Sequence, residues 1–216
     1  MPEKHLMVID PAVVKPAIES YNRLVCSTPY PLTYHLPALY GLTSIEQMKN
    51  NVRGIIIMGS AASVHDGNSW QDEITEILLD AFSENIPTLG LCYGHQLLAH
   101  IFGGNVGPLW SGEKKQGMRI VNIVNDPLWG PARSGPLVYS HQDGIIDCPP
   151  DFDVIAESDL VEIEGIASRS RPFWGFQPHI EATQAFVDHH GIPVTDPSKA
   201  FDFGHQIMDR FIMSLI

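Results

Sequence analysis

The seven residues Gly90-Leu91-Cys92-Tyr93-Gly94-His95-Gln96 place a cysteine between two glycines at a predicted junction of strand and helix. The apolar residues 86–89 before them predict a short buried strand. Residues 97–102 after them predict a helix, which Gly103-Gly104 ends. Glycines beside a nucleophile permit the tight turn that exposes it, as in nucleophile elbows built around serine. The stretch therefore predicts a cysteine nucleophile for acyl transfer.

Cys92 stands at the predicted N-terminus of a helix, where the helix dipole favours the thiolate, the reactive form of this side chain. A free cysteine is more often a small buried apolar residue, and this is our interpretation of Cys26 and Cys148. For Cys92, the strand before it and the helix after it favour a catalytic role over packing.

The composition argues against several classes of function. The chain has 216 residues and a formal net charge of −12 without a basic run, which disfavours nucleic acid and anionic membranes as partners. Three cysteines fit a reducing compartment better than a disulfide scaffold. The apolar run before Asp10 is too short for a signal peptide or a membrane span. We therefore expect a cytoplasmic protein.

The ten histidines are scattered, and no spacing of cysteine and histidine matches a structural zinc site. His189-His190, before Gly191, predicts a solvated turn rather than a pair of metal ligands. The sequence also lacks a glycine-rich phosphate-binding loop. It therefore predicts neither a metal nor a cofactor.

The first half of the chain alternates predicted strands and helices. The apolar runs and the helical spacings between them fall at 6–9, 17–24, 54–58, 72–82 and 86–89. Continuous apolar strands separated by helices predict a parallel sheet covered on both faces. Active sites form beyond the carboxyl ends of such strands, and Gly59 and Cys92 lie at two of these ends.

The second half is richer in strands. Alternating or apolar runs that predict them fall at 118–124, 137–139, 152–156, 165–168 and 173–177. Residues 201–216 predict a closing amphipathic helix. No linker divides the chain. We expect a single α/β domain over residues 1–216, with a mostly parallel central sheet and a β-rich second half.

A thiol that attacks an amide needs a base, and the base needs a partner that orients it. Gly175-Phe176-Gln177-Pro178-His179-Ile180-Glu181 supplies such a pair. Pro178 favours an extended backbone before it, and in an extended segment His179 and Glu181 point to the same side. On spacing alone, an exposed loop pair is the better interpretation.

Together these segments resemble the class I (triad) glutamine amidotransferases. That family has a Gly-x-Cys-x-Gly-x-Gln elbow and a later Gly-x-Gln-x-His-x-Glu segment, which correspond to 90–96 and 175–181. Residues 57–64 resemble its oxyanion loop, and Ser140-His141-Gln142-Asp143 resembles its Ser-His-x-Asp segment. The likeness is greatest to the glutaminase domain of GMP synthetases. It implies a flavodoxin-like fold.

The resemblance also implies roles for individual residues. Cys92 would attack the side-chain amide of glutamine and form a thioester, while His179 would transfer protons and Glu181 would fix its tautomer. The backbone N–H groups of Gly59 and Tyr93 would form the oxyanion hole. The residues implied in substrate binding are Gln96, Ser140, His141 and Gln142.

Two departures from the family pattern fall next to these residues. Pro178 and Ile180 stand where the family has phenylalanine and proline, so the local backbone is expected to differ. The oxyanion loop has Gly59-Ser60-Ala61 instead of Gly-Gly-Pro, which leaves the orientation of the Gly59 N–H open. Some relatives reorient this loop only when a partner binds, which implies a low basal activity.

The 35 residues that follow Glu181 in the 216-residue chain are too few for a synthetase domain. We therefore expect either a separate ATP-using synthetase subunit that receives the ammonia, or direct hydrolysis of γ-glutamyl amines or peptides. A non-catalytic glutaminase-like regulatory module and a cysteine-based redox protein are the alternatives from other classes. The polar segment 110–117 predicts a solvated surface loop.

Overall fold

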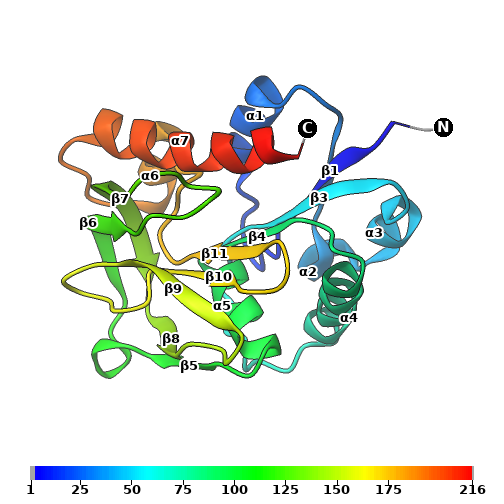
Figure 1. The fold of residues 1–216 in the computed structure, drawn as a ribbon, viewed down its shortest axis with the longest axis horizontal. Helices are drawn as coiled ribbons and strands as arrows, with labels where there is room; N and C mark the ends of the chain where they lie inside the picture. Colours follow the sequence, from blue (N-terminus) through cyan, green and yellow to red (C-terminus); the bar gives the residue numbers. More distant parts are fainter. Residues whose placement is uncertain (1–2, 216) are drawn as a thin grey trace.

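The computed structural model describes residues 3–215, and within them a nine-stranded sheet runs through the molecule (Figure 1). Its strands lie in the order β2-β1-β3-β4-β11-β10-β9-β6-β7, and a separate small sheet pairs β5 with β8. The strands are β1 (His5–Ile9), β2 (Leu32–His35), β3 (Val52–Ile57), β4 (Thr88–Leu91), β5 (Asn105–Pro108), β6 (Lys115–Ile123), β7 (Arg133–His141), β8 (Asp143–Asp147), β9 (Phe152–Glu157), β10 (Gly165–Ser168) and β11 (Phe173–Phe176).

The large sheet has a parallel half and an antiparallel half. From β2 to β11, neighbouring strands run parallel, and from β11 to β7 they run antiparallel. The prediction of a parallel sheet extended by a β-rich second half is confirmed, and the two halves are continuous. The carboxyl ends of β1, β3, β4 and β11 consequently lie at one edge of the sheet, where sites form in such folds.

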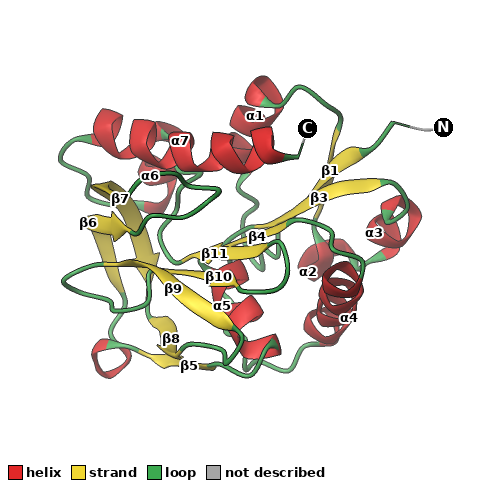
Figure 2. Ribbon diagram, viewed as in Figure 1, coloured by secondary structure: helices red, strands yellow, loops and turns green. Residues whose placement is uncertain are grey.

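Helices cover both faces of the sheet, with α1 and α7 on one face and α4 and α5 on the other (Figure 2). The helices are α1 (Ile18–Ser27), α2 (Pro37–Tyr40), α3 (Thr43–Met48), α4 (Ser69–Ser83), α5 (Tyr93–Ile101), the 3₁₀ turn η1 (Trp110–Gly112), α6 (Gln184–His190) and α7 (Pro197–Ser214). None of the helices within residues 3–215 combines the length and apolar character that crossing a lipid bilayer requires.

Alternation along the buried strands creates the two cores. In β1, Leu6 and Val8 pack in the cluster that includes Phe211 of α7, while Met7 and Ile9 pack in the cluster on the opposite face. These four side chains are at most 1% exposed, so the strand is buried on both faces. This explains why its sequence is a continuous apolar run rather than an alternating one.

Element boundaries differ from the predictions at the elbow. The strand predicted at 86–89 is Thr88–Leu91, because Pro87 has no N–H for the ladder and only its carbonyl accepts, from Ile55 N at 2.8 Å. The helix predicted at 97–102 begins at Tyr93, directly after Cys92. The predicted turn at His189-His190 is wrong, because these residues form the last turn of α6.

Candidate active site

Cys92 lies at the turn between β4 and α5. Its backbone angles, φ 49° and ψ −99°, fall in a region that residues other than glycine rarely adopt. Hydrogen bonds hold it there, from Cys92 N to Phe176 O at 2.8 Å and from Gln96 N to Cys92 O at 3.1 Å. A Cβ on Gly90 would lie 2.5 Å from the carbonyl of Gly94. The tight turn predicted from the glycines is therefore present.

His179 and Glu181 follow β11 in a turn rather than in the extended segment that Pro178 predicted. His179 forms an isolated antiparallel bridge with Val138, in which His179 N donates to Val138 O at 2.8 Å, and the chain then turns, with Ala182 N donating back to His179 O at 3.2 Å. Its side chains nevertheless meet, with His179 Nδ1 2.8 Å from Glu181 Oε1. The exposed-loop interpretation is wrong, since His179 is 7% exposed and Glu181 1% exposed.

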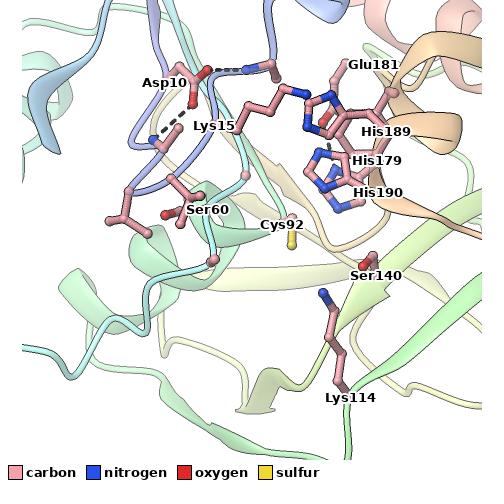
Figure 3. A pocket seen from close by; sticks show the side chains of 17 residues that line it. Asp10, Lys15, Ser60, Cys92, Lys114, Ser140, His179, Glu181, His189 and His190 are labelled. Carbon is pink, nitrogen blue, oxygen red and sulfur yellow. Dashed lines mark hydrogen bonds and ion pairs between the residues drawn. The ribbon is translucent and has the colours of Figure 1, made fainter. Parts of the chain in front are cut away.

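Cys92, His179 and Glu181 line one cavity of about 420 Å³ at the carboxyl edge of the parallel strands (Figure 3). Gly59, which follows β3, lines it too, and a Cβ there would lie 2.9 Å from His179 Cε1 and 3.5 Å from Cys92 Cβ. Three sequence motifs far apart in the chain therefore converge on one space. Its volume is in the range of roughly 300–1,000 Å³ typical of small-molecule pockets.

The electrostatics of His179 favour a protonated ring. Burial opposes the charge, but the Glu181 carboxylate and the Cys92 sulfur beside the ring outweigh burial and raise the pKa of His179 to about 10. Because His179 Nδ1 donates to the Glu181 carboxylate, the other ring nitrogen, Nε2, remains for the thiol and the substrate. The arrangement can hold a protonated imidazole beside the Cys92 sulfur.

The two predicted oxyanion amides lie at the ends of neighbouring elements, with Gly59 after β3 and Tyr93 at the first position of α5. Among the hydrogen bonds of residues 3–215, none uses either of these two N–H groups. Ser60 connects the segment after β3 to the segment after β1, because its Oγ donates to Pro11 O at 2.7 Å. The same Oγ accepts from Ala62 N at 3.1 Å. Their role as an oxyanion hole stays a prediction.

Of the four predicted substrate contacts, only Ser140 lines the cavity. Gln96 is 5% exposed, and its Nε2 donates to Asp143 O at 2.7 Å and to Gln177 Oε1 at 3.1 Å. His141 is also buried, with Nδ1 2.8 Å from Asp143 O. Gln142 is exposed, and its carbonyl accepts from Leu109 N. These placements assign Gln96 and His141 to support of the site rather than to its wall.

Several residues that the sequence interpretation missed line the cavity. Two come from the loop after β1 and two from the end of α6, and the fifth comes from the segment predicted as a solvated loop. They are Asp10, Lys15, Lys114, His189 and His190. The position of Asp10 at the carboxyl end of a predicted strand was a usable signal. The other four carried none.

Asp10 organises one wall of the cavity. It is 1% exposed, and its two carboxylate oxygens accept from Ala12 N at 3.1 Å and from Ala17 N at 2.8 Å. Tyr34 also donates its hydroxyl to this carboxylate. Burial raises the pKa of Asp10 despite these hydrogen bonds. The side chain therefore closes the loop 11–16 onto the end of β1.

Comparison with known proteins agrees with this geometry. The family model for glutamine amidotransferase class-I matches residues 17–192. The chain belongs to the class I glutamine amidotransferase family, which confirms the resemblance seen in the motifs.

Among its relatives are the proteins named GMP synthase [glutamine-hydrolyzing] of Staphylococcus aureus strains JH9 and N315, each 34% identical over 140 residues. Those matches cover 64% of this chain but only 26% of the relatives, so the matched part of the chain spans about a quarter of their length.

Two solved structures share the fold. One, a glutamine amido transferase of Methylobacillus flagellatus, has a TM-score of 0.78 at 16% identity and covers 99% of this chain and 94% of that one. The other, from Thermoplasma acidophilum and described as a GMP synthase subunit, has a TM-score of 0.76 at 20% identity and covers 100% and 95%. At these identities the likeness concerns the fold alone.

Proposed function

We propose that this chain, acting as one glutaminase domain over residues 1–216, hydrolyses the side-chain amide of glutamine through a cysteinyl thioester. The products are glutamate and ammonia. The observation that supports this most is the convergence of Cys92, His179 and Gly59 on one cavity, with Glu181 Oε1 2.8 Å from His179 Nδ1. Membership of the class I family supports the same chemistry.

In the first half-reaction the Cys92 thiolate attacks the amide carbon, and a carbon–sulfur bond forms. The negative charge that moves to the amide oxygen is stabilised by the N–H groups of Gly59 and Tyr93. His179 then donates its proton to the leaving nitrogen, and the carbon–nitrogen bond breaks. Ammonia leaves, and the glutamyl group remains on sulfur.

In the second half-reaction the now neutral His179 accepts a proton from water, and the resulting hydroxide attacks the thioester carbon. The carbon–sulfur bond breaks and glutamate leaves, so the thiolate and the imidazolium are restored. Glu181 keeps the same tautomer of His179 through both steps. The cycle consumes one water and needs no further reactant.

The ammonia is proposed to pass to a separate ATP-using synthetase. The S. aureus relatives carry both the glutamine-hydrolysing name and a length about four times the matched region. A structural neighbour from T. acidophilum, of nearly the same extent as this chain, is described as a subunit. Both facts support a partner that supplies the acceptor.

The test measures ammonia and glutamate from glutamine, with the protein alone and with ATP-using synthetases added. Cys92→Ala is expected to abolish release, and a glutamine-like chloroketone is expected to label residue 92. Cys26→Ala and Cys148→Ala are the matched controls, because these thiols lie outside the cavity. If the parent protein neither releases ammonia nor is labelled under any of these conditions, the proposal is wrong and a non-catalytic module is favoured.

A second candidate uses the same triad on γ-glutamyl amines or peptides. It is favoured by Lys15 and Lys114, which line the cavity and have no ion-pair partner among residues 3–215. In a chain of net charge −12, two such cations fit a substrate with an anionic group beyond the scissile amide. Turnover of γ-glutamyl amino acids, compared with γ-glutamyl alkylamines and with glutamine, separates the two candidates.

A further inference from the structure

A series of buried, hydrogen-bonded polar groups reaches the Cys92 thiol, and the reaction steps proposed above do not involve them. Its first member is Gln177, which is fully buried at the end of β11. The Nε2 atom of Gln177 donates to Cys92 Sγ at 3.6 Å. The backbone of Gln177 is fixed as well, because its N–H donates to Glu164 O at 2.8 Å. The donor to the sulfur is therefore a fully buried side chain whose backbone is also hydrogen-bonded.

The orientation of the Gln177 amide follows from its neighbours. The main-chain carbonyl of Asp143 can only accept, so the side-chain group that contacts it at 2.7 Å must be the NH₂ of Gln96. The same NH₂ lies 3.1 Å from the Gln177 side chain and requires an oxygen there. The NH₂ of Gln177 must then face the sulfur. One carbonyl thus determines the direction of both amides.

The Asp143 carbonyl is itself held by a buried group. His141 Nδ1 lies 2.8 Å from it, and His141 Nε2 lies 3.0 Å from Arg119 Nη2. Because the guanidinium can only donate, Nε2 accepts and Nδ1 carries the hydrogen that binds the carbonyl. Burial and the adjacent Arg119 lower the pKa of His141 to about 3, so the ring stays neutral in this role.

Arg119 completes the chain with a buried ion pair. Its Nη2 donates to Glu164 Oε2 at 2.5 Å, and the two side chains are 4% and 0% exposed. The Glu164 backbone carbonyl is the one that accepts from Gln177 N. The chain of hydrogen bonds that starts at Gln177 therefore returns to Gln177 through Glu164, and the NH₂ of Gln177 is the group that it directs at Cys92.

We propose that Gln177 is a further catalytic residue, whose side-chain N–H stabilises the Cys92 thiolate and fixes the sulfur at the cavity. The inference rests on the proposed thioester mechanism. Gln96 acts through Gln177 and is a positioning residue. A hydrogen bond to the charged form of an acid favours that form, so the donor increases the thiolate fraction of the resting protein.

The same hydrogen bond acts again when the thioester is hydrolysed. As water attacks and the carbon–sulfur bond breaks, the electron pair returns to sulfur, and the Gln177 N–H stabilises the developing thiolate. Gln177 transfers no proton and forms no covalent bond, and His179 remains the acid and base. The amide only supplies a fixed dipole in a buried site.

The test follows alkylation of residue 92 by iodoacetamide against pH, without substrate, in the parent protein, Gln177→Met and Gln96→Met. Peptide mass spectrometry separates Cys92 from Cys26 and Cys148. In Gln177→Met the pH midpoint is expected to rise by about one unit, since a hydrogen bond to a charged group contributes about that much. Gln96→Met keeps the Gln177 donor but removes the hydrogen bond that orients its amide, so a smaller rise of the pH midpoint is expected.

Gln71→Met is the matched control. Gln71 is another buried glutamine, and it bonds to Ser63 O and Tyr93 Oη rather than to sulfur, so its loss is expected to affect stability and leave the midpoint unchanged. An unchanged midpoint in both Gln177→Met and Gln96→Met would overturn the inference, and Gln96→Met decides the matter if Gln177→Met does not fold. This experiment measures alkylation and not turnover. A protein that releases no ammonia would therefore contradict the glutaminase proposal without changing the alkylation midpoints.

Discussion

The parallel and antiparallel halves of the sheet place their polar residues in different ways. In the parallel half, the proposed reactive groups lie just beyond the strand ends, as Gly59, Cys92 and His179 do. In the antiparallel half, Arg119 and Glu164 lie inside the protein and pair with each other. The parallel half therefore places these groups at the cavity, whereas the Arg119–Glu164 pair of the antiparallel half is buried and does not line it.

The largest expected effect comes from removing the proposed acid and base of the parallel half. His179→Ala is expected to lower ammonia release by roughly 10²–10⁴-fold, the usual contribution of a positioned proton donor and acceptor. The measurement is the rate of ammonia formation from glutamine. His100→Ala is the control, since His100 is exposed at the end of α5. Equal losses in both variants would contradict the assignment.

Substitutions in the antiparallel half are expected to lower the stability of the protein. Arg119→Met leaves the buried Glu164 carboxylate without its partner, and the free energy of unfolding is expected to fall by about 3–5 kcal/mol. Arg169→Met removes the exposed ion pair with Asp153, which lies at 2.7 Å, and is expected to change the free energy of unfolding far less, because solvent screens the two charges. Urea denaturation measures the free energy of unfolding of both variants. Similar losses would show that the buried ion pair contributes no more to stability than the exposed one.

A third experiment concerns pH. The proposed mechanism needs a protonated His179 at the start of the cycle, so activity is expected to fall as the pH rises through the pKa of about 10. Glu181→Gln removes the carboxylate that holds the proton, which lowers the pKa of His179 and moves the alkaline limit to lower pH. The pH dependence of kcat/KM measures this shift. An alkaline limit that stays in place would show that Glu181 does not govern the imidazole.

The smallest expected effect concerns the two cations of the cavity. Lys114→Met and Lys15→Met are each expected to raise KM up to about fivefold with little change in kcat, because an exposed charge contributes about 1 kcal/mol or less. Lys199→Met is the control, since Lys199 pairs with Asp196 outside the cavity. If kcat falls while KM is constant, these lysines belong to the chemistry rather than to binding.

The sequence predicted the central features of the fold because they depend on local patterns. Apolar runs identified the buried strands, and glycines around Cys92 identified a turn that only they permit. The short strand β2 and the helix α3 escaped notice, because their mixed residues carry neither a clear alternation nor a helical stripe. Convergence of Cys92 with His179 came from family motifs rather than from periodicity.

The supporting contacts were beyond such an analysis. Gln96 was expected at the substrate, but it meets Gln177, which lies 81 positions later in the chain. His141 was expected there too, and it is held by Arg119 from the neighbouring strand. A single sequence gives spacing along the chain, whereas these roles depend on which side chains face each other across a sheet.

The attachment of loop 11–16 has a consequence for how this protein can diverge. One carboxylate, Asp10, accepts from Ala12 N and from Ala17 N, so both ends of the loop are fastened at one point. Residues 13–16 are therefore expected to tolerate exchange or lengthening with β1 and α1 in place. Under the proposed function, exchange of this loop is expected to change which substrate the cavity accepts while Cys92 and His179 keep their positions.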